Sequence, residues 1–181
     1  MSTDVGAAFR EVMRAELAPA LRALAFRGGP ATYARDAGDV WVLVNLQSAR
    51  AFPFGMGEPG VLSFTANLGV ASKRILEAQG TRPTKRPERR DWHYDNRIGM
   101  FLAPPFDKWW AIEPAMSRPQ VQAVVLDFRK CLVDQGLNGI ARYSSDDLLR
   151  QYWAAELEHL SPRERAWFSV LLGARGQRDS G

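Results

Sequence analysis

The sequence predicts an α+β fold: one mostly antiparallel sheet of about five strands, packed by an N-terminal helix and a long C-terminal helix, with additional C-terminal helices. Two observations indicate this fold. Apolar residues recur at three- and four-residue spacing near both ends of the chain, which is typical of amphipathic helices. Between residues 31 and 112, apolar and polar residues alternate in consecutive segments with short connections, which favours antiparallel strands.

The N-terminal helix is expected over residues 4–25. Its apolar stripe consists of Phe9, Val12, Met13, Leu17, Leu21 and Leu24. Pro19 falls inside this stripe and predicts either a kink or an earlier end, because proline has no backbone N–H to donate. Three strands are expected next, over residues 31–35, 40–48 and 61–70, with a Gly/Pro-rich loop at 51–60 before the third.

The second half of the chain is predicted to begin with a short helix at 71–79, ended by Gly80, and a loop at 81–91 that is compatible with disorder. Two more strands are expected at 92–102 and 108–112. A capping-box pattern, Ser117 with Gln120, predicts the start of the long helix, which reaches Gly136. Further helices are expected over 145–159 and from Ser161. We therefore predict a core domain over residues 1–142 and a helical extension over 143–181 that packs on it and has a frayed tail.

Length and composition are those of one globular domain. With 46% hydrophobic residues, the 181-residue chain has ample material for a core. Apolar runs fall short of the ~20 residues of a membrane span, and the N-terminus lacks the apolar block of a signal peptide, so we expect a cytoplasmic protein. The one cysteine, Cys131, has no partner for an intrachain disulfide, and its apolar surroundings predict a buried side chain.

The net charge of +4 is concentrated in residues 81–91, which contribute +3 of it. The cations of this basic loop are Arg82, Lys85, Arg86, Arg89 and Arg90. Such a loop can neutralise phosphates, so nucleic-acid binding through residues 81–91 is one hypothesis. Aromatic residues do not interleave with these cations, however, and a charge run of this kind is more often a solvated loop.

A polar face on otherwise apolar strands is the most informative feature. Asn45 and Gln47 share one face of the second strand, and Thr65 and Asn67 share one face of the third. If these strands pair, four uncharged hydrogen-bonding side chains gather on one sheet face. His93, Asp95 and Arg97 alternate along the next strand and can join them. Either this face is simply solvated, as in many antiparallel sheets, or it binds a ligand or partner.

The adjacent tryptophans Trp109 and Trp110 form a second candidate. Neighbouring residues on a strand point to opposite faces, so one indole can enter the core while the other reaches the polar face or solvent. Tryptophan is enriched at recognition sites, although packing in the core or at an edge is its commoner role.

Signatures of catalysis and metal binding are sparse. The two histidines, His93 and His159, have no partners at metal-ligand spacing, and the sequence contains no phosphate loop, dinucleotide fingerprint or nucleophile elbow. We therefore expect no metal and no cofactor. One enzyme hypothesis remains, with His93 as a general base oriented by Asp95 or a neighbouring residue. Two residues apart on a strand, the side chains of His93 and Asp95 lie about 7 Å apart, which is too far to assure a hydrogen bond between them.

Several segments in order resemble a known family. These are VLVNLQSAR at 42–50, FTANLGV at 64–70, WHYDNRIGMFL at 92–102 and DKWW at 107–110. Together with the N-terminal helix they resemble the bacterial family catalogued as domain of unknown function 4304, over roughly residues 5–135. The matching elements are Gln47 with Ser48, Asn67 to Gly69, His93 with Arg97, and Trp109 with Trp110. The residue before the family's histidine is often cysteine but is Trp92 here. The resemblance implies the fold class and brings no established activity.

These observations lead to one main functional hypothesis, a non-catalytic binding or protein-interaction domain. Its site consists of the polar sheet face with tryptophan anchors: Asn45, Gln47, Thr65, Asn67, His93, Arg97, Trp109 and Trp110. The partner is an unknown protein or small molecule, and a homodimer is compatible with the same surface. The small-enzyme hypothesis on His93 and the nucleic-acid hypothesis on residues 81–91 are the alternatives.

Overall fold

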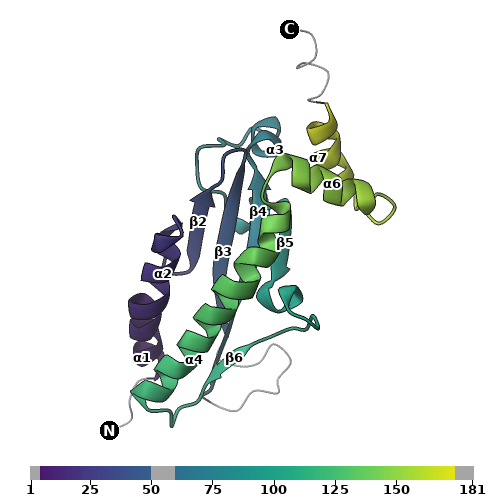
Figure 1. The fold of residues 1–181 in the computed structure, drawn as a ribbon. Helices are drawn as coiled ribbons and strands as arrows, with labels where there is room; N and C mark the ends of the chain where they lie inside the picture. Colours follow the sequence, from purple (N-terminus) through teal and green to yellow (C-terminus); the bar gives the residue numbers. More distant parts are fainter. Residues whose placement is uncertain (1–4, 50–59, 174–181) are drawn as a thin grey trace. The chain divides into compact units, whose positions relative to one another are not determined.

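The computed structural model describes residues 5–49 and 60–173 of the 181-residue chain. A six-stranded, mostly antiparallel sheet has the order β1-β2-β3-β4-β5, and β6 pairs with β4 (Figure 1). The strands are β1 (Arg27–Gly28), β2 (Thr32–Asp36), β3 (Val40–Ala49), β4 (Leu62–Ser72), β5 (Tyr94–Arg97) and β6 (Trp110–Ile112). This sheet, with helices at both ends of the chain, confirms the predicted α+β class.

The helices follow the predicted periodicity closely, with π-helical turns inserted in two of them. The α-helices are α1 (Val5–Val12), α2 (Ala18–Ala23), α3 (Lys73–Ala78), α4 (Arg118–Cys131), α5 (Leu137–Ile140), α6 (Asp146–Ala155) and α7 (Pro162–Leu172). The π-helical turns are Met13–Leu17 and Leu132–Gly136, and the 3-10 turns are Arg89–Asp91, Ile98–Phe101 and Ala141–Tyr143. The capping box predicted at Ser117 and Gln120 is present, and a second one joins Ser161 and Glu164.

The chain forms two compact units. The first comprises Met1–Tyr33, Val44–Leu68 and Asn96–Gly139, and the second comprises Ala34–Leu43, Gly69–Asp95 and Ile140–Gly181. The division into a core domain over 1–142 and an extension over 143–181 stays a prediction. The predicted frayed tail and most of the predicted Gly/Pro-rich loop lie outside the described residues.

Pro19 breaks the hydrogen-bond pattern of the N-terminal helix without ending it. The helix continues through a π-helical turn, in which the Ala18 N–H donates to the Met13 carbonyl, and Pro19 then occupies the first turn of α2. Because proline is tolerated in the first turn, where its missing N–H is not needed, the chain stays helical to Ala23.

The core of the first unit gathers around Phe64 on β4. Its ring centroid lies 4.7 Å from that of Phe9 on α1, 5.2 Å from that of Phe128 on α4 and 6.1 Å from that of Trp110 on β6. Helix α4 contacts α1 and the π-helical turn Met13–Leu17 that follows α1. Figure 1 shows α4 running along the sheet. Cys131 is buried here as predicted, and burial raises the pKa of its thiol.

The predicted strand at 92–102 was too long. It forms β5 only as far as Arg97 because the chain then folds back on itself at Gly99. The Gly99 carbonyl accepts hydrogen bonds from the Leu102 and Phe106 N–H groups, each at 3.2 Å. A Cβ at Gly99 would lie 2.0 Å from the Phe106 carbonyl oxygen, so only glycine permits this close approach.

The core of the second unit contains Trp92, which packs with Ala34, Leu43, Ala71 and Leu76. Its indole covers Gly69 on β4, where a Cβ would lie 2.0 Å from the ring atom Cε3. Helices α6 and α7 pack against each other, and α7 also contacts α3. The ring of Trp153 on α6 stacks near that of Trp167 on α7, with centroids 6.2 Å apart.

Candidate functional site

Three amide side chains of the first unit, Asn45, Gln47 and Asn67, form one hydrogen-bonded group that we call the amide cluster. The Asn67 Nδ2 group donates to Asn45 Oδ1 at 3.4 Å and to Gln47 Oε1 at 3.2 Å. The Asn45 Nδ2 group in turn donates to Thr32 Oγ1 on β2 at 3.0 Å. The structure thus brings together the side chains that strand alternation placed on one face of β3 and β4.

The amide cluster is largely buried, yet it has open hydrogen-bonding groups. Asn67 is only 2% exposed, whereas Asn45 and Gln47 are half-buried. Within the described part of the chain, no side-chain partner is found for the Gln47 Nε2 donors or for the Asn67 Oδ1 acceptor. An amide N–H and an amide oxygen are therefore both available beside each other. This pair of groups is complementary to a peptide group or another amide.

Thr65 does not join the amide cluster, because its hydroxyl donates to the Lys108 carbonyl at 2.9 Å. That hydrogen bond holds Lys108, in the segment that follows the Gly99 turn, against β4. Strand β6 pairs antiparallel with β4, with Ser63 opposite Ala111. Continuing this register places Trp109 opposite Thr65, on the same side of the sheet as the polar face.

Arg97 and Trp109 form a second contact in this region. The Arg97 guanidinium lies over the Trp109 indole at 5.1 Å from the ring centroid and forms an ion pair with Asp107. Both side chains are half-buried. Nearby, Phe106 is the most exposed large hydrophobic residue of the described chain, at 51%. Phe106 was not expected to be a site residue, because its exposure depends on the turn at Gly99, which the alternation pattern does not predict.

Trp110 points the other way and belongs to the core. Its ring centroid lies 4.9 Å from that of Phe128, and its Nε1 donates to Asp127 Oδ2 at 2.8 Å. The expectation that the two adjacent tryptophans face opposite sides therefore matches their placement, and it leaves Trp109 as the one near the polar face.

His93 lies in the second unit, apart from the contacts of the amide cluster. Its Nδ1 accepts a hydrogen bond from the Ser72 N–H at 2.9 Å, and its ring packs edge-on against Trp167 with centroids 4.7 Å apart. Burial, assisted by the charge of Arg163, lowers the pKa of His93 to about 3. With Nδ1 occupied, the imidazole is neutral with its proton on Nε2, and it has no lone pair free to accept a proton. These contacts favour a structural role over that of a general base.

Asp95 does not orient His93, since its carboxylate pairs with Arg89 at 3.1 Å on the surface. That pair is one of several contacts that hold the basic loop 81–91 in place. The Trp41 Nε1 donates to the Pro83 carbonyl at 2.8 Å, and Arg163 donates to the Arg90 carbonyl at 2.9 Å. The loop is thus anchored rather than disordered, and part of its charge is neutralised locally.

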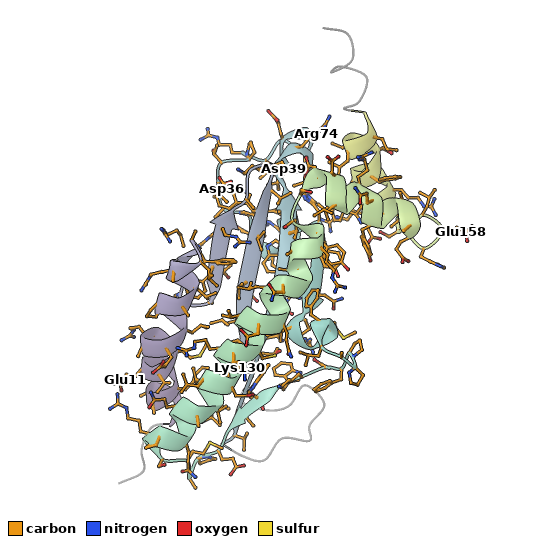
Figure 2. The ribbon with its side chains drawn as sticks, in the orientation of Figure 1. Glu11, Asp36, Asp39, Arg74, Lys130 and Glu158 are labelled. Carbon is orange, nitrogen blue, oxygen red and sulfur yellow. The ribbon has the colours of Figure 1, made fainter. Side chains whose placement is uncertain are left out.

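A charged group at the β2–β3 turn of the second unit was not anticipated from sequence. Figure 2 shows Asp36 and Asp39 at this turn, with Arg74 on α3 close by. Lys73 Nζ pairs with Asp36 at 2.6 Å, and Asp39 Oδ2 accepts from the Asp146 N–H at 2.8 Å. The Lys73 hydrogen bond lowers the pKa of Asp36. These bonds close the turn against α3 and α6, so they serve the fold.

Fold and site together define an α+β domain whose candidate site consists of amide, aromatic and guanidinium side chains. The chain belongs to the family described as Domain of unknown function (DUF4304), which matches residues 17–135. This confirms the resemblance seen in the sequence. No curated protein and no solved structure matches the chain.

Residues 5–49 and 60–173 contain no group of three or more His, Cys, Asp or Glu side chains arranged to hold a metal ion. Among the same residues, every helix is too short or too polar to cross a membrane.

Proposed function

We propose that this chain is a non-catalytic protein-binding domain that recognises an extended segment of its partner through the amide cluster and the neighbouring Arg97–Trp109 pair. The observation that supports this most strongly is the amide cluster itself. Three polar side chains occupy a sheet face and bond one another, and they leave an N–H donor and a C=O acceptor unused. A peptide group of a bound segment offers the matching acceptor and donor.

The aromatic and cationic side chains nearby fit the same function. Tryptophan and arginine are the residues whose truncation most often weakens protein interfaces, and here they already contact each other. Holding Arg97 against Trp109 and Asp107 reduces the side-chain entropy that binding would otherwise remove. Phe106, half exposed on the adjoining turn, offers apolar area at the rim. A cytoplasmic location and self-association through this surface stay predictions of the same proposal.

The test is a photo-crosslinking experiment. A benzoylphenylalanine placed at position 106 should form a discrete crosslinked product in an extract of the source cells, and Trp109→Ala should reduce its yield about 30-fold because a central tryptophan contributes about 2 kcal/mol or more. Gln47→Ala should reduce it several-fold. A product of twice the chain's mass identifies a homodimer.

The matched control carries the same crosslinker at Leu157, a position of the second unit that is 45% exposed. It should give a different pattern that Trp109→Ala leaves unchanged. Thermal midpoints of all variants should stay within a few degrees of the parent. Identical products at both positions, or a product at 106 that persists in both variants, would show that this face is not a binding surface.

A further inference from the structure

We propose that a cavity in the first unit, beside the N-terminal helical segments, binds a small amphipathic anion: a molecule with a carboxylate or phosphate head group and an apolar tail. The cavity has a volume of about 470 Å³ and lies between the N-terminal helical segments and strands β2 and β3. That volume falls in the range of about 300–1,000 Å³ found for small-molecule sites.

The floor of the cavity is apolar. Leu46 on β3 and Phe64 on β4 alternate with the residues of the amide cluster, so their side chains leave the opposite side of the sheet. Phe9, Met13 and Ala18 line the cavity from the helical segments. These side chains provide the surface for an apolar tail.

Tyr33 places one buried polar group in this cavity. The residue is 5% exposed and lines the cavity, and no described residue hydrogen-bonds its hydroxyl. Gly29, with φ at +114°, lets the preceding loop lie against it: a Cβ there would come within 3.1 Å of the Tyr33 hydroxyl. Burial raises the pKa of Tyr33, and Arg22 partly offsets this, so at neutral pH the phenol is a hydrogen-bond donor. The hydroxyl is not among the fully enclosed polar atoms of the described chain, so a ligand in the cavity can accept a hydrogen bond from it.

The rim of the cavity is cationic. Arg10, Arg14 and Arg22 line it, and the described lining residues include no Asp or Glu. Arg14 and Arg22 form no ion pair with any described residue, although other surface arginines in the protein do. Guanidinium groups match carboxylate and phosphate oxygens in a two-pronged geometry. The cations and the Tyr33 hydroxyl can therefore hold an anionic head group while its tail lies on the apolar floor.

The π-helical turn explains how the helix presents these groups. Residues Met13–Leu17 make a wider turn than an α-helix, and this turn includes Arg14 and ends beside Ala18. Such turns rotate the side chains that follow and are frequent at functional sites. Here the turn also accommodates Pro19.

The test is isothermal titration of the full chain with three probes of ten carbons each: decanoate, decyl phosphate and 1-decanol, at monomeric concentrations. We expect one or both anions to bind with micromolar to submillimolar Kd and decanol to bind at least tenfold more weakly. The tighter of the two anions identifies the head group. In the double variant Arg14→Gln with Arg22→Gln, the Kd for the anion should rise about tenfold or more, and Tyr33→Phe should raise it several-fold.

Arg142→Gln, an exposed arginine of the second unit, is the matched control and should leave the Kd unchanged. Far-UV circular dichroism of each variant verifies that it is folded. Failure of both anions to bind the parent chain, equal affinity for decanol, or an unchanged Kd in the arginine double variant would each overturn the proposal. The protein-binding proposal does not depend on this result, because Trp109→Ala, its main test, changes a residue that does not line the cavity.

Discussion

The amide cluster and the surroundings of His93 bury polar groups in opposite ways. In the amide cluster, each amide bonds to a neighbouring side chain, and the network ends in the unused Gln47 Nε2 and Asn67 Oδ1 groups. Around His93, four buried polar atoms of the second unit have no hydrogen-bond partner among the described residues. They are Trp92 Nε1, His93 Nε2, Trp153 Nε1 and Asp146 Oδ1.

Energetics explain the difference. An unpaired buried polar atom costs about 1–3 kcal/mol. Burying a tryptophan removes about 150–250 Å² from water, which contributes roughly 4–6 kcal/mol at about 25 cal/mol per Å². The rings of Trp92 and Trp153 therefore stabilise the second unit even though their N–H groups have no hydrogen-bond partner among the described residues. Asn45, Gln47 and Asn67 bring little apolar area, so packing does not explain their presence. Their polarity itself needs a reason, which is the argument for binding.

The largest expected effect lies in the second unit. Gly69→Ala should lower the free energy of unfolding by about 3 kcal/mol, because the new Cβ meets the buried Trp92 ring. Urea denaturation measures it. Gly173→Ala, where a Cβ would make only ordinary van der Waals contacts, the nearest at 3.6 Å, is the control and should change stability by less than about 0.5 kcal/mol. In a Trp92→Leu background the Gly69→Ala loss should shrink. An equal loss in both backgrounds would mean that the ring contact is not the cause.

The next effect is a pH dependence that originates at His93. The folded pKa is about 3 and the unfolded value is 6.5, so the unfolded state binds more protons between these values. Stability is therefore fully present above pH 6.5 and falls as the pH drops toward 3. Between pH 7.5 and 5.5 the loss should be about 1.4 kcal/mol, measured by urea denaturation at both pH values.

His159→Gln, which changes the exposed histidine, should retain this pH slope, whereas His93→Phe should remove it at the expense of lower stability at both pH values. A slope that survives in His93→Phe would assign the titration to another group.

The smallest effect is expected in the amide cluster. Asn67→Ala removes the donor shared by Asn45 and Gln47 and should lower the free energy of unfolding by about 1 kcal/mol. Gln151→Ala, on the exposed face of α6, should change it by less than about 0.5 kcal/mol. A double-mutant cycle between Asn45→Ala and Asn67→Ala should show coupling of roughly 0.5 kcal/mol or more. Strict additivity would mean that the amides do not act as a network.

Local patterns in the sequence were sufficient to predict those features of the fold and the site that depend on short-range interactions. Alternation along residues 40–48 and 61–70 correctly placed Asn45, Gln47 and Asn67 on one face, and the motif around Ser117 located the start of α4. These features follow from the period of a strand and from bonds between residues three apart, so they can be predicted without a tertiary structure.

The tertiary structure alone decided which of these groups act together. His93 shares an alternation pattern with Arg97, yet it is buried, accepts a hydrogen bond from the Ser72 N–H, distant in sequence, and has its pKa lowered by burial. The strand after it ends early because Gly99 and Phe106 approach each other. The cavity beside Tyr33 arises from helix packing on a sheet. Burial and desolvation depend on residues far apart along the chain, and a one-dimensional pattern does not encode those distances.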